Sequence, residues 1–206
     1  SSGSSGSSSF TYCIFEYIDC SNESGNNAYG ALDMVNRPVM IENSVFRNNR
    51  ADYGGAIFLR NNSNLTLNEC AFENNGADYW GGALYFGAAS GVIKNCILKN
   101  NSASSGGGFY VYQGGPSFTN CLIYSNSATG SGSGIYLYQA NSSFKMVNTT
   151  CSKNINSGSV KDFQFNGVSG QQPKIVNSII WGSNIGTLDA NLITIVNSAI
   201  QGFTNY

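Results

Sequence analysis

Apolar and polar residues alternate in short segments that recur along most of the chain. The most frequent segment reads apolar-x-Asn-[Cys/Ser/Thr]-x-apolar. Its copies begin at Ile41, Leu67, Ile93, Phe118, Met146, Ile175 and Ile195, with a weaker copy at Phe10. Alternation with a period of two is typical of β-strands, and no stretch shows a sustained helical period. The pattern therefore predicts an all-β chain of short strands.

Two further segments recur in phase with the first. One reads YGALDM from Tyr29, GGAIFL from Gly54, GGALYF from Gly81, GGFYVY from Gly107 and SGIYLY from Ser133. The other is the tail FRNNRA, FENNGA, LKNNSA or IYSNSA. Three extended segments joined by Asn or Gly bends, repeated about every 26 residues, fit one turn of a solenoid. We expect a Ser/Gly-rich linker at residues 1–9, followed over residues 10–206 by a parallel β-helix of about eight coils with three short strands each.

In such a solenoid, like side chains lie about 4.8 Å apart in columns. Asn tolerates the left-handed backbone of a sharp bend, and stacked amides can hydrogen-bond along a column. An outward column that alternates in charge favours ion pairs between neighbouring strands. Two apolar columns are expected to face inward: Phe10, Ile41, Leu67, Ile93, Phe118, Met146, Ile175 and Ile195, and Phe15, Phe46, Phe72, Leu98, Ile123, Cys151, Ile180 and Ile200. The polar columns are Asn43, Asn95, Asn120, Asn148, Asn177 and Asn197; Asn49, Asn75, Asn101, Asn126 and Asn154; and the charged Glu16, Arg47, Glu73 and Lys99.

The repeats resemble those of a known group of proteins. The GGAI and FxxN motifs are similar to repeats in chlamydial polymorphic outer-membrane protein passengers and other secreted right-handed β-helix proteins. The segments NSIIWGSN (177–184) and NSAIQG (197–202) resemble parts of bacterial choice-of-anchor surface β-helix proteins. The resemblance covers about residues 10–202. It implies a right-handed β-helix outside the cytosol, but no activity, because this fold includes adhesins, passengers, lyases and tailspikes.

The low charge of the chain narrows the partners to be expected. Charged residues make up 10% and the formal net charge is −1, so no strong field attracts nucleic acid or anionic lipid. No apolar run reaches the length of a membrane-spanning helix. The chain does not begin with Met, and we expect a processed or excerpted segment. N-glycosylation sequons occur at Asn22, Asn61, Asn64, Asn100, Asn141 and Asn148.

The candidates for catalysis are few. Asp52 and Asp78 occupy similar places in ADYGG and ADYWGG, so they could stack in adjacent coils. Carboxylates about 5 Å apart would perturb each other's pKa and approach the spacing of a retaining glycosidase. A solvated turn that recurs with the coil is the simpler interpretation. The chain has no His, which removes the commonest general base. We expect no catalytic residue, cofactor or metal site.

Five of the six cysteines fall into two groups, and the sixth, Cys151, belongs to the second inward column. Cys70, Cys96 and Cys121 share one column, where we expect stacked free thiols in the core, although a disulfide or a soft metal site is an alternative. We expect Cys13 and Cys20 to lie outside that column, where a disulfide between them could act as an N-terminal staple.

The GGA segments are apolar on both faces. If Phe109, Val111, Ile135 and Leu137 face the core, neighbouring residues must face outward because strand side chains alternate. The predicted outer stripe is Leu32, Met34, Ile57, Leu59, Leu84, Phe86, Tyr110, Tyr112, Tyr136 and Tyr138. Such a stripe could be covered by the chain itself, bind a partner or another copy, or stack on sugar rings.

These patterns favour an extracellular, non-catalytic structural or adhesive protein. We expect a rod about 40 Å long that contacts copies of itself, in a homo-oligomer or filament, or a cell-surface protein or glycan. The outer stripe and uncapped solenoid ends would make these contacts. The alternative is a polysaccharide-binding or polysaccharide-degrading β-helix protein. We expect neither nucleic acid as a partner nor a membrane span.

Overall fold

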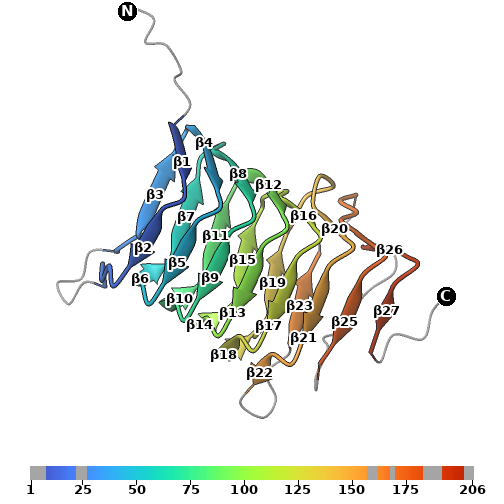
Figure 1. The fold of residues 1–206 in the computed structure, drawn as a ribbon. Helices are drawn as coiled ribbons and strands as arrows, with labels where there is room; N and C mark the ends of the chain where they lie inside the picture. Colours follow the sequence, from blue (N-terminus) through green and yellow to red (C-terminus); the bar gives the residue numbers. More distant parts are fainter. Residues whose placement is uncertain (1–7, 22–26, 157–161, 168–169, 183–191, 202–206) are drawn as a thin grey trace, which may run out of the picture.

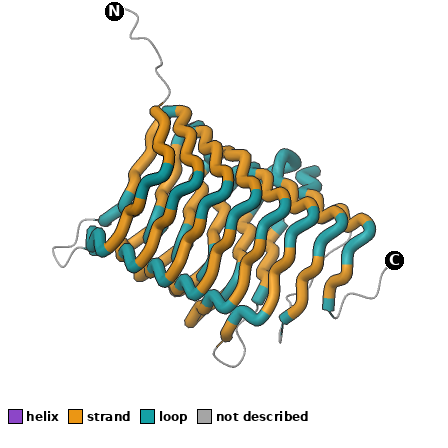
Figure 2. Tube along the Cα trace, viewed as in Figure 1, coloured by secondary structure: helices purple, strands orange, loops and turns teal. Residues whose placement is uncertain are grey.

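The structure is a computed structural model that describes residues 8–21, 27–156, 162–167, 170–182 and 192–201. Within these ranges the regular secondary structure consists of β-strands, which wind as stacked coils around one long core (Figure 1 and Figure 2). The strands form four parallel sheets, here called sheets A to D. Each coil passes in turn through sheets D, A, B and C.

Sheets A and B have eight strands each. Sheet A contains β1 (Ser8–Thr11), β4 (Pro38–Glu42), β8 (Asn64–Asn68), β12 (Ser90–Lys94), β16 (Ser117–Thr119), β20 (Lys145–Val147), β24 (Lys174–Val176) and β26 (Thr194–Val196). Sheet B contains β2 (Ile14–Glu16), β5 (Val45–Arg47), β9 (Ala71–Glu73), β13 (Ile97–Lys99), β17 (Leu122–Tyr124), β21 (Thr150–Ser152), β25 (Ile179–Trp181) and β27 (Ala199–Ile200).

Sheets C and D are shorter, with five and six strands in the described residues. Sheet C contains β6 (Arg50–Tyr53), β10 (Gly76–Trp80), β14 (Ser102–Ser105), β18 (Ser127–Ser131) and β22 (Ile155–Asn156). Sheet D contains β3 (Leu32–Val35), β7 (Ile57–Arg60), β11 (Leu84–Gly87), β15 (Phe109–Tyr112), β19 (Ile135–Tyr138) and β23 (Phe163–Asn166).

The predicted solenoid is confirmed, but a complete coil has four strands rather than three. The segment expected as one strand is divided between sheets A and B, because its central residue has a left-handed backbone, with φ of +49° at Asn43 and +54° at Asn95. Such a residue turns the chain through a corner. Five coils carry all four strands in the described residues, while the expected eight levels are seen only in sheets A and B.

The core consists of the predicted inward columns. Ile41 pairs with Leu67, and Leu67 pairs with Ile93, in direct register on neighbouring strands of sheet A. All three side chains are fully buried. In the second column, the rings of Phe46 and Phe72 stack with centroids 4.9 Å apart. Repetition of the sequence therefore becomes repetition in space, with each coil covering the apolar face of its neighbours.

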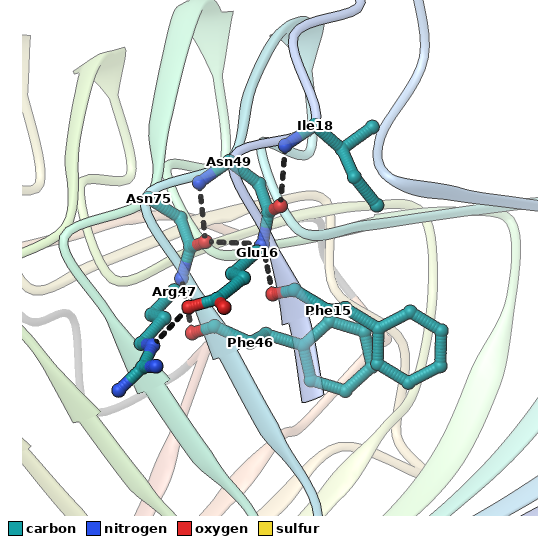
Figure 3. Close-up of polar contacts among 7 residues, drawn as sticks. All are labelled: Phe15, Glu16, Ile18, Phe46, Arg47, Asn49 and Asn75. Carbon is teal, nitrogen blue, oxygen red and sulfur yellow. Dashed lines mark hydrogen bonds and ion pairs between the residues drawn. The ribbon is translucent and has the colours of Figure 1, made fainter. Parts of the chain in front are cut away.

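The second Asn column forms a buried ladder at the corner between sheets B and C (Figure 3). Nδ2 of Asn49 donates to the Phe15 carbonyl and to Oδ1 of Asn75, both at 2.9 Å. The backbone N–H of Asn49 donates to the same Oδ1, and Oδ1 of Asn49 accepts from the N–H of Ile18. These Asn residues do not themselves bend the chain. The preceding residue does, as at Asn48 with φ of +57°.

The Gly-rich corner between sheets C and D brings backbones into close contact. Gly106 has a left-handed backbone with φ of +68°, a conformation that residues with a side chain rarely adopt. A Cβ at Gly107 would overlap the backbone carbonyl oxygens of Ser127 and Ser133. This corner therefore requires small residues because coils approach closely there.

Candidate functional site

The two carboxylates considered for catalysis have different surroundings. ADYWGG has one residue more than ADYGG, and the register between β6 and β10 shifts between Ala77 and Trp80, so that Trp80 pairs with Tyr53. Asp52 is buried and accepts a hydrogen bond from the backbone N–H of Ala28 at 2.8 Å. Asp78 is exposed and pairs with Arg50. The expectation that the two carboxylates are equivalent was therefore wrong, because the extra residue between Ala77 and Trp80 changes the local path of the strand.

Neither a metal centre nor a membrane helix is found in the part of the chain that the structure describes. Across these ranges, no group of three or more Cys, Asp or Glu side chains could hold a metal ion. No helix there is long and apolar enough to cross a membrane.

The central thiol column is buried and free, as predicted. Cys70, Cys96 and Cys121 stack in the wall of the core, and Sγ of Cys96 donates to the Lys94 carbonyl at 3.0 Å. Hydrogen bonds with Cys121 and Cys70, together with burial, raise the pKa of Cys96. The hydrogen bond with Cys96 lowers the pKa of its two neighbours. Because all three thiols are buried, they have a structural role.

The suggested staple between Cys13 and Cys20 is absent. Both thiols are free, and Sγ of Cys20 donates weakly to the Gly30 carbonyl at 3.8 Å. Ser44 occupies the level of the thiol column before Cys70, and the N–H of Cys13 donates to Oγ of Ser44 at 3.1 Å. Cys13 therefore lies at the same corner, one level earlier, and continues the thiol column. The disulfide hypothesis was wrong because these cysteines lie at different corners of the first coil.

The predicted outer face of sheet D was partly wrong, because the segments of successive coils had been aligned one residue out of register. The corner GGG before Phe109 aligns with the GGA before Ile57 and Leu84, so Phe109 rather than Tyr110 pairs with Leu84. A slip of one residue moves every side chain of a strand to the opposite face. The predicted outer residues that instead face the core are Leu32, Met34, Ile57, Leu59, Leu84 and Phe86.

Aromatic residues occupy the outer face, including the four tyrosines predicted there, Tyr110, Tyr112, Tyr136 and Tyr138. Phe58, Tyr85, Tyr110 and Tyr136 form one column, and Tyr112 and Tyr138 lie in a second. The rings of Phe58 and Tyr85 stack at 4.7 Å, and those of Tyr85 and Tyr110 stack at 5.5 Å. Burial raises the pKa of Tyr85 and Tyr110.

The stacked geometry limits what this aromatic column can bind. Parallel rings cover one another's faces, whereas recognition of sugar rings uses an open aromatic face. Trp80 covers the column further, with its ring 5.3 Å from that of Tyr110. Phe58, Tyr85 and Tyr110 are consequently buried. The chain therefore covers much of this face itself, while Tyr79, Trp80 and Tyr112 remain exposed.

A long exposed apolar row lies on sheet B and was not among the predicted sites. The exposed fractions are 60% at Ile14, 40% at Ile97, 37% at Leu122 and 47% at Ile179. In the sequence, this row corresponds to the second x of the main repeat, the residue that directly follows Cys, Ser or Thr. Because that x lies next to an inward residue of a strand, an apolar residue there must face outward. The sheet B row is Ile14, Val45, Ala71, Ile97, Leu122, Thr150, Ile179 and Ala199.

A second outward row lies two residues further along each strand of sheet B. Arg47 pairs with Glu16 at 2.6 Å, and Lys99 pairs with Glu73 at 3.0 Å, which confirms the predicted alternating charges. Trp181, 57% exposed, lies toward the other end. Figure 1 shows the eight strands side by side from β2 to β27. The mixed row, charged in its first half, is Glu16, Arg47, Glu73, Lys99, Tyr124, Ser152 and Trp181.

A polar groove of about 320 Å³ lies at the corner between sheets D and A. Its lining includes the side chains of Asn62, Ser90, Gln113, Asn141 and Ser143, which offer amide and hydroxyl groups. Of the sequon residues, Asn22 lies outside the described residues and Asn141 is half-buried, while the exposed ones are Asn61, Asn64, Asn100 and Asn148.

Comparison with known proteins agrees with this architecture. The family model for the right-handed β-helix region matches residues 2–151, most of the 206-residue chain. No curated protein matches the sequence. The match covers the first six levels of the sheet A and sheet B ladders. The chain therefore belongs to the right-handed β-helix family.

Proposed function

We propose that this chain is an extracellular, non-catalytic structural or adhesive protein. It is a rigid rod that associates with copies of itself or with a cell-surface partner. The apolar row of sheet B carries the proposal, because all its members except Thr150 are apolar and its large side chains Ile14, Ile97, Leu122 and Ile179 are exposed. A continuous apolar surface of this kind usually marks a contact site.

The interior supports the role of a rod. Large side chains such as Phe46, Phe72 and Phe118 fill the core, and the Asn ladder links successive coils through both backbone and side-chain atoms. The functional groups available to a ligand therefore lie on the outside. Asp52 and Asp78 bond to the Ala28 N–H and to Arg50, and these contacts favour structural roles for both carboxylates over glycoside hydrolysis.

An extracellular location is supported by composition and surface chemistry. The chain is nearly uncharged and rich in Asn and Ser, and four sequon residues are exposed. Its repeats resemble those of chlamydial passengers and choice-of-anchor surface proteins, which act outside the cytosol. Association of such rods would produce a homo-oligomer, a filament or a surface layer.

Polysaccharide binding is the second candidate. The groove beside Gln113 and Asn141 offers hydrogen-bonding groups that suit a hydroxyl-rich ligand. The Tyr112 and Tyr138 rings lie near this corner and stack at 5.6 Å. The groove is small, however, and lacks an open aromatic platform, so this candidate ranks below association.

One experiment separates these functions. The purified chain is incubated alone, with whole cells and with a panel of soluble and insoluble polysaccharides, and new reducing ends, co-sedimentation and light scattering are measured together. Association of the chain with itself or with cell surfaces, without new reducing ends, supports the proposal. Reducing ends that form with the wild type and are lost in Asp52→Asn or Asp78→Asn would instead establish an enzyme.

A further inference from the structure

We propose that two copies of this chain bind each other through the outer faces of sheet B, with their coil axes antiparallel. This inference rests on the proposed function and specifies its geometry. The two copies are related by a two-fold axis that lies between the sheets and runs parallel to the strands. Each level of one copy then faces the opposite level of the other, so β2 faces β27 and β13 faces β17.

The apolar row is complementary to itself under this operation. Ile97 lies opposite Leu122 of the second copy at the centre of the interface, where a desolvated apolar contact contributes most. Toward the ends, Val45 lies opposite Ile179, and the large Ile14 lies opposite the small Ala199. Two-fold dimers use the same patch on both copies, so every such contact occurs twice.

The mixed row is complementary as well. Its cations lie in the first four levels and its aromatic side chains in the later levels. Reversal places Arg47 opposite Trp181 and Lys99 opposite Tyr124, pairings that favour cation–π contact. Arg47 and Lys99 retain their carboxylate partners within each copy, so no unpaired charge is buried.

The competing two-fold arrangement lacks this fit. An axis parallel to the coils reverses the strand direction and places the apolar row of one copy over the mixed row of the other. Ile97 would then lie opposite Lys99 of the same level, which removes an ion-paired cation from water against an aliphatic side chain. The antiparallel arrangement avoids this cost at every level.

The face is large enough for a dimer. Eight strands at the usual spacing extend over about 35 Å, and the five residue steps from one corner to the next, as from Asn43 to Asn48, extend over about 17 Å, which gives roughly 600 Å² per copy. Both copies together would bury about 1,200 Å², the lower end of the range for specific interfaces. The net charge of −1 presents little electrostatic barrier to the approach of two copies.

Sedimentation velocity of the full chain at increasing concentration tests the dimer. We expect the wild type to be a dimer at micromolar concentration and Leu122→Glu to be a monomer, with at least a tenfold weaker association, because each new carboxylate would be buried against Ile97 of the other copy without a partner. The matched control is Val92→Glu, on sheet A, whose exposed fraction of 37% equals that of Leu122. It should leave the dimer intact, and circular dichroism checks that each variant is folded.

Cross-linking tests the antiparallel order independently. In a Cys13→Ser, Cys20→Ala background, a mixture of Ala71→Cys and Thr150→Cys chains treated with a short bifunctional maleimide should form the mixed cross-link in preference to either self-cross-link. A predominant Ala71→Cys self-cross-link would overturn the antiparallel arrangement. Association that survives Leu122→Glu, or a monomeric wild type that still binds cell surfaces, overturns the dimer but leaves the proposed function standing.

Discussion

At the scale of single residues, buried hydrogen bonds determine where Asn is required. Asn48 and Asn49 are chemically identical neighbours, yet one bends the backbone at the corner and the other joins the ladder. Only the second is fully buried with its amide completely bonded. Position in the coil therefore decides whether an Asn contributes through its backbone or through its side chain.

Asn75→Ala should destabilise the chain strongly. The substitution leaves the N–H of Asn49 and the Phe46 carbonyl without their partner inside the core. We expect a loss of about 3 kcal/mol in the free energy of unfolding, measured by urea denaturation. The exposed Asn64→Ala should lose less than about 0.5 kcal/mol. Equal losses in the two variants would show that the ladder adds no stability.

Alkaline pH should also destabilise the fold through buried acids. Burial raises the pKa of Cys151 from its ordinary value of 9.0 to about 12, and it raises the pKa of Tyr85 and Tyr110. The unfolded chain loses these protons at lower pH than the folded chain does. The stability contributed by Cys151 is thus complete below about pH 9 and declines as the pH rises toward 12, by about 1.4 kcal/mol per unit. Urea midpoints from pH 8 to 11 measure this decline, which should be shallower in Cys151→Val; an unchanged slope there would contradict the assignment.

At the scale of the strand and its corner, the repeat was readable in the sequence but the register was not fully so. The apolar columns beginning at Phe10 and Phe15 were predicted correctly, since an inward column must stay apolar in every coil. Sheet D was misread, because its corner ends in Ala at position 56 and in Gly at position 108. Because three glycines precede Phe109, a match to the two glycines of the other copies can be made in two registers. Only the pairing with the neighbouring coil places Phe109 over Leu84.

The corners of sheets C and D offer a test of coil spacing. Gly107→Ala should reduce stability by about 3 kcal/mol, because the added methyl group overlaps carbonyl oxygens of the next coil and cannot rotate away. Gly76→Ala is the matched control, since its nearest neighbour would be Oγ of Ser102 at 3.5 Å. Thermal unfolding of both variants provides the comparison. A Gly107→Ala protein as stable as the control would mean that the coils are more widely spaced than described.

At the scale of the whole molecule, the solenoid separates stability from recognition. The core and the Asn ladder hold the coils together, whereas the outer rows are free to vary. The alternating charges from Glu16 to Lys99 were predicted from the sequence, but the neighbouring apolar row was not, because small or polar residues such as Ala71 and Thr150 interrupt its pattern. The prediction that Asp52 and Asp78 are equivalent was wrong because one extra residue in the second coil changed their surroundings.

Hydroxyl-radical footprinting of the wild-type chain, at concentrations below and above its association, tests most directly whether the outer face of sheet B is the contact surface. We expect Ile97, Leu122 and Trp181 to lose at least threefold in oxidation rate on association. Tyr79 and Trp80, exposed on sheet C, should keep their rates. Protection of Tyr79 and Trp80, with Ile97, Leu122 and Trp181 unchanged, would place the contact on the aromatic side and contradict the assignment to sheet B.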